Sequence, residues 1–293
     1  MPLGPYHFSP KSGGQGVDQR QMMFNTKLLQ IAQKNQSLVC LGLDPDPQLM
    51  PRMGVFEFNK AIIDATSDLV CAYKPNLAFY EALGIDGLVA LQKTVKHIAG
   101  KVPVIGDAKR GDIGNSAKAY SKALFEVFGF DAATVNPYMG FDALEPFLAH
   151  REKAIFILCR TSNPGAADFQ DLSCSSAHGP HRLYKIVAEK AQEWNREDNI
   201  GLVVGATYPE ELLAVRQASP QMTLLIPGIG AQGGSLDLAV RNGVDATGQR
   251  AIFASSRQIL YASPGSDFDQ AAREATDKMR RQINSILSNR PAG

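Results

Sequence analysis

The 293-residue chain has little that would tie it to a membrane, a metal or an oxidising compartment. No apolar run approaches the length that spans a bilayer, and the four cysteines form no CxxC pair. The net charge is only +1, so no strong field attracts nucleic acid or an acidic membrane. HExxH and GxSxG are also missing, which counts against zinc-protease and α/β-hydrolase chemistry. We therefore expect a cytoplasmic protein with reduced cysteines and no bound metal, in which any anion recognition is local.

Residues 1–21 differ in composition from the rest of the chain. They are rich in Gly, Pro, Ser and Gln, and they contain no apolar segment of the kind that a secretory signal needs. We expect them to form a disordered tail or to be a remnant of expression, with the folded domain over residues 22–293. The chain is 44% hydrophobic and 20% charged, a composition that can build a sizeable core.

Short apolar runs alternate with amphipathic helical stretches along this domain. The eight runs that predict strands are residues 38–43, 69–73, 102–106, 132–135, 154–159, 201–205, 224–226 and 251–254. Helical spacing of apolar residues follows at 56–67, 83–98, 116–128, 183–194, 209–218 and 235–242. Eight alternating units in a chain of this length predict a single (β/α)8 barrel with a parallel sheet. Residues 25–34 would form an N-terminal helix that caps the bottom of the barrel, and residues 268–287 would close its outer ring.

A doubly wound open sheet is the rival fold, and the ends of the apolar runs separate the two. Nearly every run ends in a chemically distinctive group: Asp44, Lys74, Asp107 with Lys109, Asn136, Thr161 with Ser162, Pro227 with Gly228, and Ser255 to Arg257. In a barrel these ends converge on one mouth, where active sites lie, so convergence favours the barrel. Residues 160–182 form the longest irregular stretch and follow one of these ends. They would either cover the mouth as a lid or, in their second half, form a flexible insertion.

The most unusual segment is Asp107-Ala108-Lys109-Arg110-Gly111-Asp112-Ile113, directly after the run 102–106. Residues i and i+2 of a strand share a face, so Asp107 and Lys109 should point the same way. Gly111 permits a turn before Asp112. A lysine held between acids is a fixed cation and a possible proton donor. For this segment alone, a solvated loop with weak ion pairs is the alternative.

Two other ends carry groups of interest. Asp44 follows the first run, and an ionised carboxylate only accepts hydrogen bonds, which suits sugar hydroxyls. Lys74, in Lys74-Pro75-Asn76, would be poorly solvated unless it is paired, and the acids after the third run are its nearest candidate partners.

A glycine-rich segment, from Pro227 to Gly234, precedes a predicted helix. It matches G-x-G-x-x-G, but it comes too late in the chain for a dinucleotide site. We interpret it as a phosphate cradle in which glycine backbone brings N–H groups close to an anion. The next run ends in Ser255-Ser256-Arg257, and an arginine can bind a phosphate bidentately. Barrels commonly build such a site from the loops after strands seven and eight.

Together these segments resemble the orotidine 5′-phosphate decarboxylases, over nearly the whole chain from about Asn25 onward. The D-x-K-x-x-D-I motif is matched by Asp107, Lys109, Asp112 and Ile113. Residues 74–76 and 161–165 resemble the longer bacterial (type 2) subgroup. The resemblance implies decarboxylation of orotidine 5′-monophosphate to uridine 5′-monophosphate, the last step of de novo UMP synthesis, with no cofactor and no metal.

The resemblance also implies roles for the matched residues. Lys74, Asp107, Lys109 and Asp112 would form an alternating row of charges, with Lys109 stabilising a carbanion and supplying the proton. Asp112 and Ile113 would come from the partner in a homodimer. Ser116 would lie by the ribose, although it equally fits the first turn of a helix. Further substrate contacts would come from Asp44, Asn76, Ser162, Pro227 and Gln232, and phosphate contacts from Gly230, Gln232, Ser256 and Arg257.

Two other functions stay open at this point. The D-x-K-x-x-D pattern is shared with magnesium-dependent sugar-phosphate decarboxylases and aldolases of the same superfamily. Those relatives tend to carry an acid where this chain has Lys74. The other possibility is a barrel that binds a nucleotide only as a sensor, and a sensor gives no reason for a lysine between two acids.

Overall fold

A computed structural model describes residues 22–176, 179–230 and 233–290. The predicted tail of residues 1–21 lies outside the described residues. Eight parallel strands form one sheet in the order β2-β1-β10-β9-β8-β5-β4-β3. Their bounds are β1 (Val39–Leu43), β2 (Ala72–Pro75), β3 (Ile105–Arg110), β4 (Ala132–Val135), β5 (Ala154–Arg160), β8 (Ile200–Val204), β9 (Thr223–Ile226) and β10 (Ala251–Ser255).

The two edge strands of this sheet meet, so the sheet closes on itself. Tyr73 of β2 is bridged to Val104, and the Tyr73 amide donates to the Pro103 carbonyl at 2.9 Å. A second bridge joins Asn76 to Asp107 at the other end of the seam. The predicted (β/α)8 barrel is therefore confirmed, and the open sheet is excluded. Closure also brings the carboxyl ends of all eight strands to one mouth.

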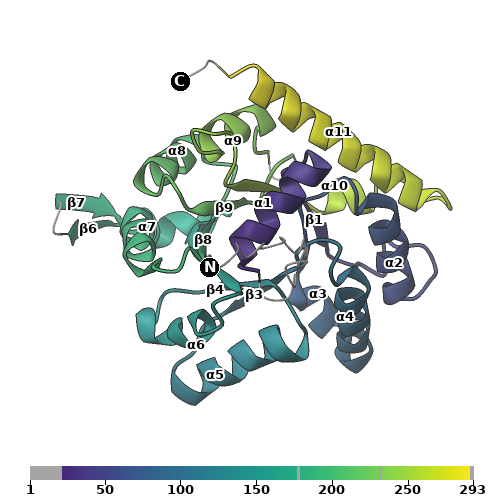
Figure 1. The fold of residues 1–293 in the computed structure, drawn as a ribbon, viewed down its shortest axis with the longest axis horizontal. Coiled ribbons are helices and arrows are strands. Elements are labelled where there is room, and N and C mark those ends of the chain that lie inside the picture. The colour runs from purple at the N-terminus through teal and green to yellow at the C-terminus, as the bar shows by residue number, and fades with distance from the viewer. Residues whose placement is uncertain (1–21, 177–178, 231–232, 291–293) are drawn as a thin grey trace, which may run out of the picture.

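Helices surround the barrel, as Figure 1 shows. The outer ring contains α2 (Val55–Thr66), α4 (Gly84–Ile98), α5 (Gly114–Lys122), α6 (Glu145–Leu148), α7 (Leu183–Trp194), α8 (Pro209–Ala218), α9 (Leu236–Gly243) and α11 (Phe268–Ser288). Shorter helical turns lie in the connections: α3 (Leu77–Glu81), η2 (Ala123–Val127), η3 (Phe141–Ala143), η4 (Pro164–Asp168) and α10 (Arg257–Leu260). None of the helices in the described ranges is long and apolar enough to cross a membrane.

The first helix, α1 (Phe24–Asn35), lies across the bottom of the barrel, as predicted (Figure 1). Its Phe24 ring meets the Phe156 ring edge-on, with 5.8 Å between centroids. Lys27 forms an ion pair of 2.8 Å with Asp131, which directly precedes β4. These contacts bury the amino ends of the strands, so the opposite end is the one left open for a ligand.

Two strands begin later than the apolar runs predict. The run 69–73 becomes β2 at Ala72–Pro75, and the run 102–106 becomes β3 at Ile105–Arg110. The early residues of both runs are buried without being part of a strand, because they pack where the chain turns into the barrel. Apolar content reports burial rather than strand hydrogen bonding. The polar segment 107–110 is thus part of strand β3, not a loop after it.

The long irregular stretch 160–182 contains an antiparallel hairpin of β6 (Ser173–Ser176) and β7 (Gly179–Arg182). His181 holds the hairpin to α7 through a contact of 2.8 Å between its Nδ1 atom and Glu189. Figure 1 shows the hairpin at the periphery, beyond α7. The second half of the stretch is therefore neither a lid over the mouth nor an unstructured insertion.

Candidate active site at the barrel mouth

A cavity of about 560 Å³ opens at the carboxyl ends of the strands. Residues from all eight barrel strands or the loops after them line it: Asp44, Lys74, Asn76, Phe79, Asp107, Lys109, Thr134, Leu158, Thr161, Ser162, Asn163, Val203, Leu225, Pro227, Gly228, Ile229, Ala254, Ser255, Ser256, Arg257 and Gln258. The convergence that the sequence predicts is therefore present. Its charged side chains lie at the carboxyl ends of β1 to β3 and after β10, polar uncharged side chains follow β5, and apolar side chains such as Leu158 and Val203 fill the wall between them.

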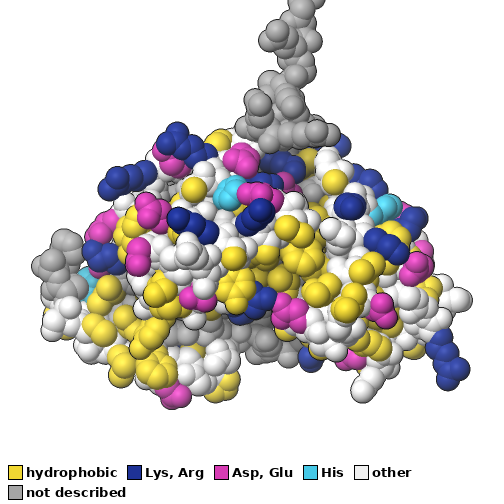
Figure 2. Space-filling view, turned by 90° about the horizontal axis from the view of Figure 1, so that it is seen from below, with side chains coloured by type: hydrophobic (Ala, Val, Ile, Leu, Met, Phe, Trp, Pro, Cys, Tyr) yellow, Lys and Arg dark blue, Asp and Glu magenta, His cyan; other side chains and the backbone are white. Residues whose placement is uncertain are grey.

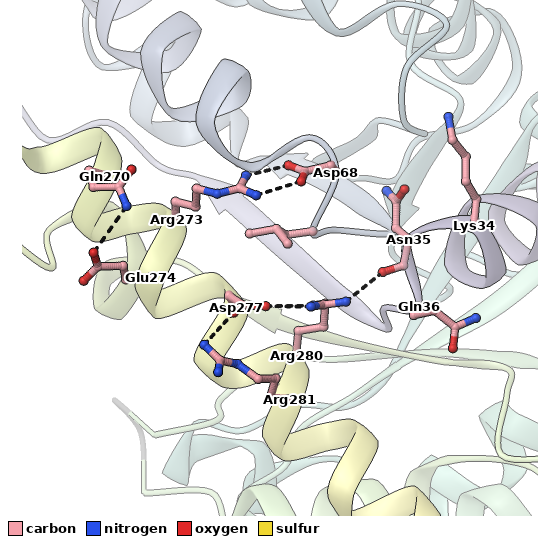
Figure 3. Close-up of a pocket in the computed structure, with 11 residues that line it drawn as sticks. Lys34, Asn35, Gln36, Asp68, Gln270, Arg273, Glu274, Asp277, Arg280 and Arg281 are labelled. Atoms are coloured by element: carbon pink, nitrogen blue, oxygen red, sulfur yellow. Dashed lines mark hydrogen bonds and ion pairs between the residues drawn. The ribbon is translucent and has the colours of Figure 1, made fainter.

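A second cavity, of about 510 Å³, lies at the opposite end of the barrel, between α11 and the segments that precede β1 and β2. Figure 3 shows that its arginines pair with two aspartates. Arg273 contacts Asp68 at 2.6 Å, and Arg280 and Arg281 contact Asp277 at 2.7 and 2.6 Å. The two Asp277 pairs lie within α11, whereas Arg273–Asp68 and a hydrogen bond from Arg280 to the Asn35 carbonyl join α11 to the segments before β2 and β1, so we interpret this cavity as structural.

Asp107 lies at the centre of the mouth, between two lysines. Its Oδ2 atom accepts a hydrogen bond from Lys74 Nζ at 2.7 Å, and its Oδ1 atom accepts one from Lys109 Nζ at 2.6 Å. The side chain of Lys74 is only 8% exposed, whereas that of Lys109 is 49% exposed. The Lys109 ammonium is thus the one that can reach a molecule in the cavity.

The two buried charges stabilise each other. Burial by itself raises the pKa of Asp107, but the Lys74 and Lys109 ammonium groups outweigh it and hold the pKa well below its usual range. Burial lowers the pKa of Lys74, but the carboxylates of Asp107 and Asp44 outweigh it and raise the pKa above its ordinary value. Asp107 and Lys74 therefore both stay charged at neutral pH, despite their burial.

Asp107 and Lys109 meet for a different reason from the one that regular strand geometry predicts. Lys109 has a left-handed backbone, with φ of 48°, and the pairing of β3 with β4 shifts between Gly106 and Arg110. Simple alternation of faces does not hold across such an irregularity. The contact predicted between the two side chains is present, but the assumed regular strand is wrong.

Asp44 and Asn76 lie side by side at the ends of β1 and β2. The Asn76 amide donates to Asp44 Oδ1 at 3.2 Å, and both residues line the cavity. The Asn76 side chain also caps α3, since its Oδ1 atom accepts from the Ala78 amide at 3.2 Å. Tyr261 holds the neighbouring backbone by donating to the Asp44 carbonyl at 3.0 Å. The Asp44 carboxylate is thereby fixed at the rim.

A buried arginine positions the loop that carries Ser162. Arg160 is only 1% exposed, and its guanidinium lies 3.9 Å from the centre of the Tyr208 ring. It pairs with Asp171 at 3.1 Å and donates to the Thr161 carbonyl at 2.9 Å. The start of the stretch 160–182 is thereby held against the barrel, which places Ser162 in the cavity wall.

The two predicted phosphate loops lie next to each other, as the barrel requires. Ser256 and Arg257 line the cavity, and the Arg257 guanidinium forms no ion pair within the described part of the chain. Gly230 has φ of 72°, and a Cβ added there would lie 2.3 Å from the Gln258 side chain. A larger residue here would be strained in the left-handed conformation and would displace the Gln258 side chain, so glycine suits the junction of the loops after β9 and β10. Gly230 itself is not among the lining residues, and Gln232 lies outside the described residues.

Besides Gly230, three predicted site residues do not line the cavity of their own chain. Asp112, Ile113 and Ser116 are not among its lining residues, and Ile113 is 56% exposed. The Asp112 carboxylate accepts from the amide of Ile113 at 2.8 Å. Within one chain the row of charges thus contains Lys74, Asp107 and Lys109, without Asp112.

Sequence reasoning missed several lining residues, above all Thr134. It lies inside a run counted as an apolar strand, yet its Oγ1 atom lies 2.9 Å from Asp107 Oδ1. Leu158 and Val203 supply an apolar wall, and nothing distinguishes them in sequence from core residues. In the described ranges, no three His, Cys, Asp or Glu side chains cluster in a way that could hold a metal ion.

Known proteins share this sequence and this architecture. The family model "Orotidine 5'-phosphate decarboxylase / HUMPS family" matches residues 37–274. An orotidine 5'-phosphate decarboxylase from Dehalococcoides mccartyi is 54% identical over 264 residues, which cover 90% of this chain and 98% of that protein. The relative of the same name from Herpetosiphon aurantiacus is 50% identical over 258 residues, covering 86% of this chain and 94% of that protein.

Two solved structures from Leishmania donovani are also similar. OMP decarboxylase superposes with a TM-score of 0.81 at 37% identity, covering 92% of this chain and 100% of that chain. UMP synthase superposes with a TM-score of 0.83 at 39% identity and covers 93% of this chain. This chain spans only 58% of the length of the UMP synthase.

We expect Asp107→Asn to lower the free energy of unfolding by about 3–5 kcal/mol at pH 7, because it leaves the buried Lys74 ammonium without its counter-charge. The pKa of Asp107 is lower in the folded protein than in the unfolded chain. The stabilisation that its charge gives is therefore complete at any pH above its unfolded-state pKa of about 4. That contribution is lost as the pH falls towards the native value. In urea unfolding, the difference in free energy of unfolding between the wild-type protein and Asp107→Asn should be constant above about pH 5 and should shrink below about pH 4.

The matched control is Asp198→Asn, which breaks the more exposed ion pair with Arg250. It should cost at most about 1 kcal/mol. A cost for Asp107→Asn that is no larger than this, or that grows in acid, would contradict the assignment of a buried charge pair.

Proposed function

Because the chain belongs to the orotidine 5′-phosphate decarboxylase family, we propose that it converts orotidine 5′-monophosphate to uridine 5′-monophosphate and CO2. It is a carboxy-lyase of pyrimidine synthesis. The observation that carries the proposal is Asp107 held between Lys74 and Lys109 at the mouth of the barrel. The free cysteines of the described residues, Cys40, Cys71, Cys159 and Cys174, fit the cytoplasm as the site of this reaction.

The reaction breaks the bond between ring carbon C6 and the carboxylate, and the electron pair stays on C6. No cofactor delocalises this pair, so the protein has to stabilise the charge with fixed cations. Lys109 is the group we assign to this role, since its ammonium is fixed by Asp107 and open to the cavity. At ~4 Å and an effective dielectric constant of about 20, one such contact is worth about 4 kcal/mol. Lys109 Nζ then donates its proton to C6, which completes UMP.

Asp107 has a second effect on the substrate. A carboxylate that enters beside it meets a negative charge that stays ionised because of its lysine neighbours. This repulsion favours the departure of CO2, although we give more weight to stabilisation of the carbanion. Lys74 keeps Asp107 charged and fixed, so it supports the reaction from inside the barrel wall.

We assign the remaining residues of the site to different parts of the substrate. Arg257 and Ser256, next to the glycine-rich loop with Gly230, would bind the 5′-phosphate, and Asp44 with Asn76 would bind the ribose hydroxyls. Ser162 would contact the pyrimidine edge, beside Pro227. Gln232 would bridge base and phosphate. Binding energy from a phosphate remote from C6 can then be used to hold the ring against Lys109.

A magnesium-dependent sugar-phosphate decarboxylase or aldolase is not favoured. Both carboxylate oxygens of Asp107 already accept from lysine ammonium groups, so a cation there would have to displace Lys74 or Lys109. The relatives that are about 50% identical to this chain are named orotidine 5'-phosphate decarboxylases, and the match covers nearly their whole length.

We propose further that the enzyme is a homodimer in which Asp112 and Ile113 complete the site of the partner. Large apolar side chains are exposed around this segment: Ile113 at 56%, Tyr138 at 87%, Met139 at 43% and Phe141 at 40%. Figure 2 shows apolar side chains gathered in the lower half of the face that lies at the bottom of Figure 1, where α5 and α6 run. An exposed apolar area next to an incomplete site is what a composite dimer would bury.

The decisive assay is the loss of orotidylate absorbance in metal-free buffer with EDTA. We expect full turnover by the wild-type protein, and a loss of at least about 10⁴-fold in kcat for Lys109→Ala with the fold intact. Inhibition by EDTA that magnesium reverses would favour the sugar-phosphate enzyme instead. Near-normal decarboxylation by Lys109→Ala would refute the role of this lysine.

Arg257→Ala should raise KM for the nucleotide about 10- to 100-fold, since it removes a charged hydrogen bond to the phosphate. Inhibition constants for UMP and uridine measure the effect. The variant should lose affinity for UMP and keep its weak affinity for uridine. Arg241→Ala is the control, because that exposed arginine pairs with Asp237 on α9. If wild-type protein bound uridine as tightly as UMP, the phosphate site would be misplaced.

Mixing two inactive variants tests the composite site. Lys109→Ala and Asp112→Asn homodimers should each be nearly inactive. After subunit exchange, heterodimers carry one site with both defects and one with neither, so about a quarter of wild-type activity should return. Activity is measured before and after exchange at constant total protein. No recovery despite exchange would show that Asp112 acts within its own subunit or not at all.

A further inference from the structure

The backbone at Lys109 departs from the strand that surrounds it. Gly106 of β3 pairs with Ala133 of β4, and the next paired position joins Arg110 to Val135. Three residues of β3, 107–109, therefore lie opposite the single residue Thr134. The two extra residues of β3 are accommodated because Lys109 adopts a left-handed conformation, with φ of 48°. Residues other than glycine rarely adopt this conformation. Such a conformation persists only where neighbouring groups hold it.

Thr134 supplies that constraint from the opposite strand. It is 1% exposed, and its Oγ1 atom accepts a hydrogen bond from the Lys109 amide at 2.9 Å. The same hydroxyl donates to Asp107 Oδ1 at 2.9 Å. The direction is settled by chemistry, because an ionised carboxylate can only accept. The Asp107 atom that Thr134 contacts also accepts from Lys109 Nζ.

These bonds form a closed ring through both ends of Lys109. The ring runs from the Lys109 amide to Thr134 Oγ1, then to Asp107 Oδ1, and back to Lys109 Nζ. One hydroxyl thus fixes the backbone that carries the lysine and also the carboxylate that orients its ammonium group. Lys74 completes the set by holding Asp107 Oδ2.

We propose that Thr134 is a positioning residue for Lys109, an inference that rests on the proposed function. Thr134 acts through the ring and takes no part in the proton transfer. Without its hydroxyl the Lys109 amide loses its acceptor and Asp107 loses one donor, so the ammonium group is free to move. A misplacement of about 1 Å at a reacting group can cost about 100-fold in rate.

The test compares Thr134→Val, which keeps the branched shape and removes the hydroxyl, with Thr134→Ser, which keeps the hydroxyl. We expect kcat to fall about 100-fold in Thr134→Val, with Kd for UMP changed less than about threefold. Thr134→Ser should restore most of kcat. The matched control is Thr223→Val, another buried strand threonine, whose hydroxyl donates to Asn25 at the bottom of the barrel. It should lose stability and keep kcat.

Three outcomes would overturn the proposal. The first is that Thr134→Val has the same kcat as the control Thr223→Val. The second is that Thr134→Val loses as much affinity for UMP as it loses in kcat, and the third is that Thr134→Ser does not restore kcat. If Thr134→Val does not fold, Thr134→Cys replaces it, and kcat should fall because a thiol donates weakly. Crystal structures give a readout independent of turnover, since Lys109 should leave the left-handed region in the variant. A wild-type protein without decarboxylase activity would refute the proposed function, while this structural readout would still test the constraint on Lys109.

Discussion

The charge on Asp107 is the constraint on which the rest of the site depends. A buried carboxylate is strongly unfavourable unless it is paired and hydrogen-bonded, and here it receives two ammonium groups and one hydroxyl. Those three partners come from β2, from β3 itself and from β4. The seam where β2 meets β3 therefore has to close before the charges are satisfied. Barrel closure and the electrostatics of the mouth are thus coupled, because the strands must pair before the partners of Asp107 reach it.

A phosphorylated substrate has to be bound at its phosphate and to react at a different atom, and the barrel provides separate groups for these two tasks. The charged groups that we assign to the reacting carbon lie at the carboxyl ends of β2 and β3, whereas the groups that we propose to bind the phosphate follow β9 and β10. An apolar wall that includes Leu158 and Val203 lies between the two. In the proposed binding mode, the phosphate is bound at one end of the cavity and the ring is held at the other end, beside Asp107. This separation lets binding energy from the phosphate serve the chemistry at a distant atom.

Rigidity at the mouth comes from groups that have no direct part in the proposed chemistry. Arg160 holds the loop of Ser162 through Asp171 and the Thr161 carbonyl, and Thr134 holds the irregular end of β3. Each is almost completely buried, so its polar atoms contribute only if their partners are in place. Functional side chains at the ends of strands are mobile by default, and these second contacts reduce that freedom.

The sequence alone was sufficient to predict the barrel, its capping helix and most of the residues at the barrel mouth. Alternating periodicities specify the order of strands and helices, and parallel strands bring their carboxyl ends together, so Asp44, Lys74, Asp107 and Arg257 could be placed from local pattern. Tertiary structure alone decided the role of Thr134, the left-handed Lys109 and the position of Asp112 outside its own cavity. Each of these depends on strand register or on which surface a side chain meets. Register is set by long-range packing, which no local pattern of residues records.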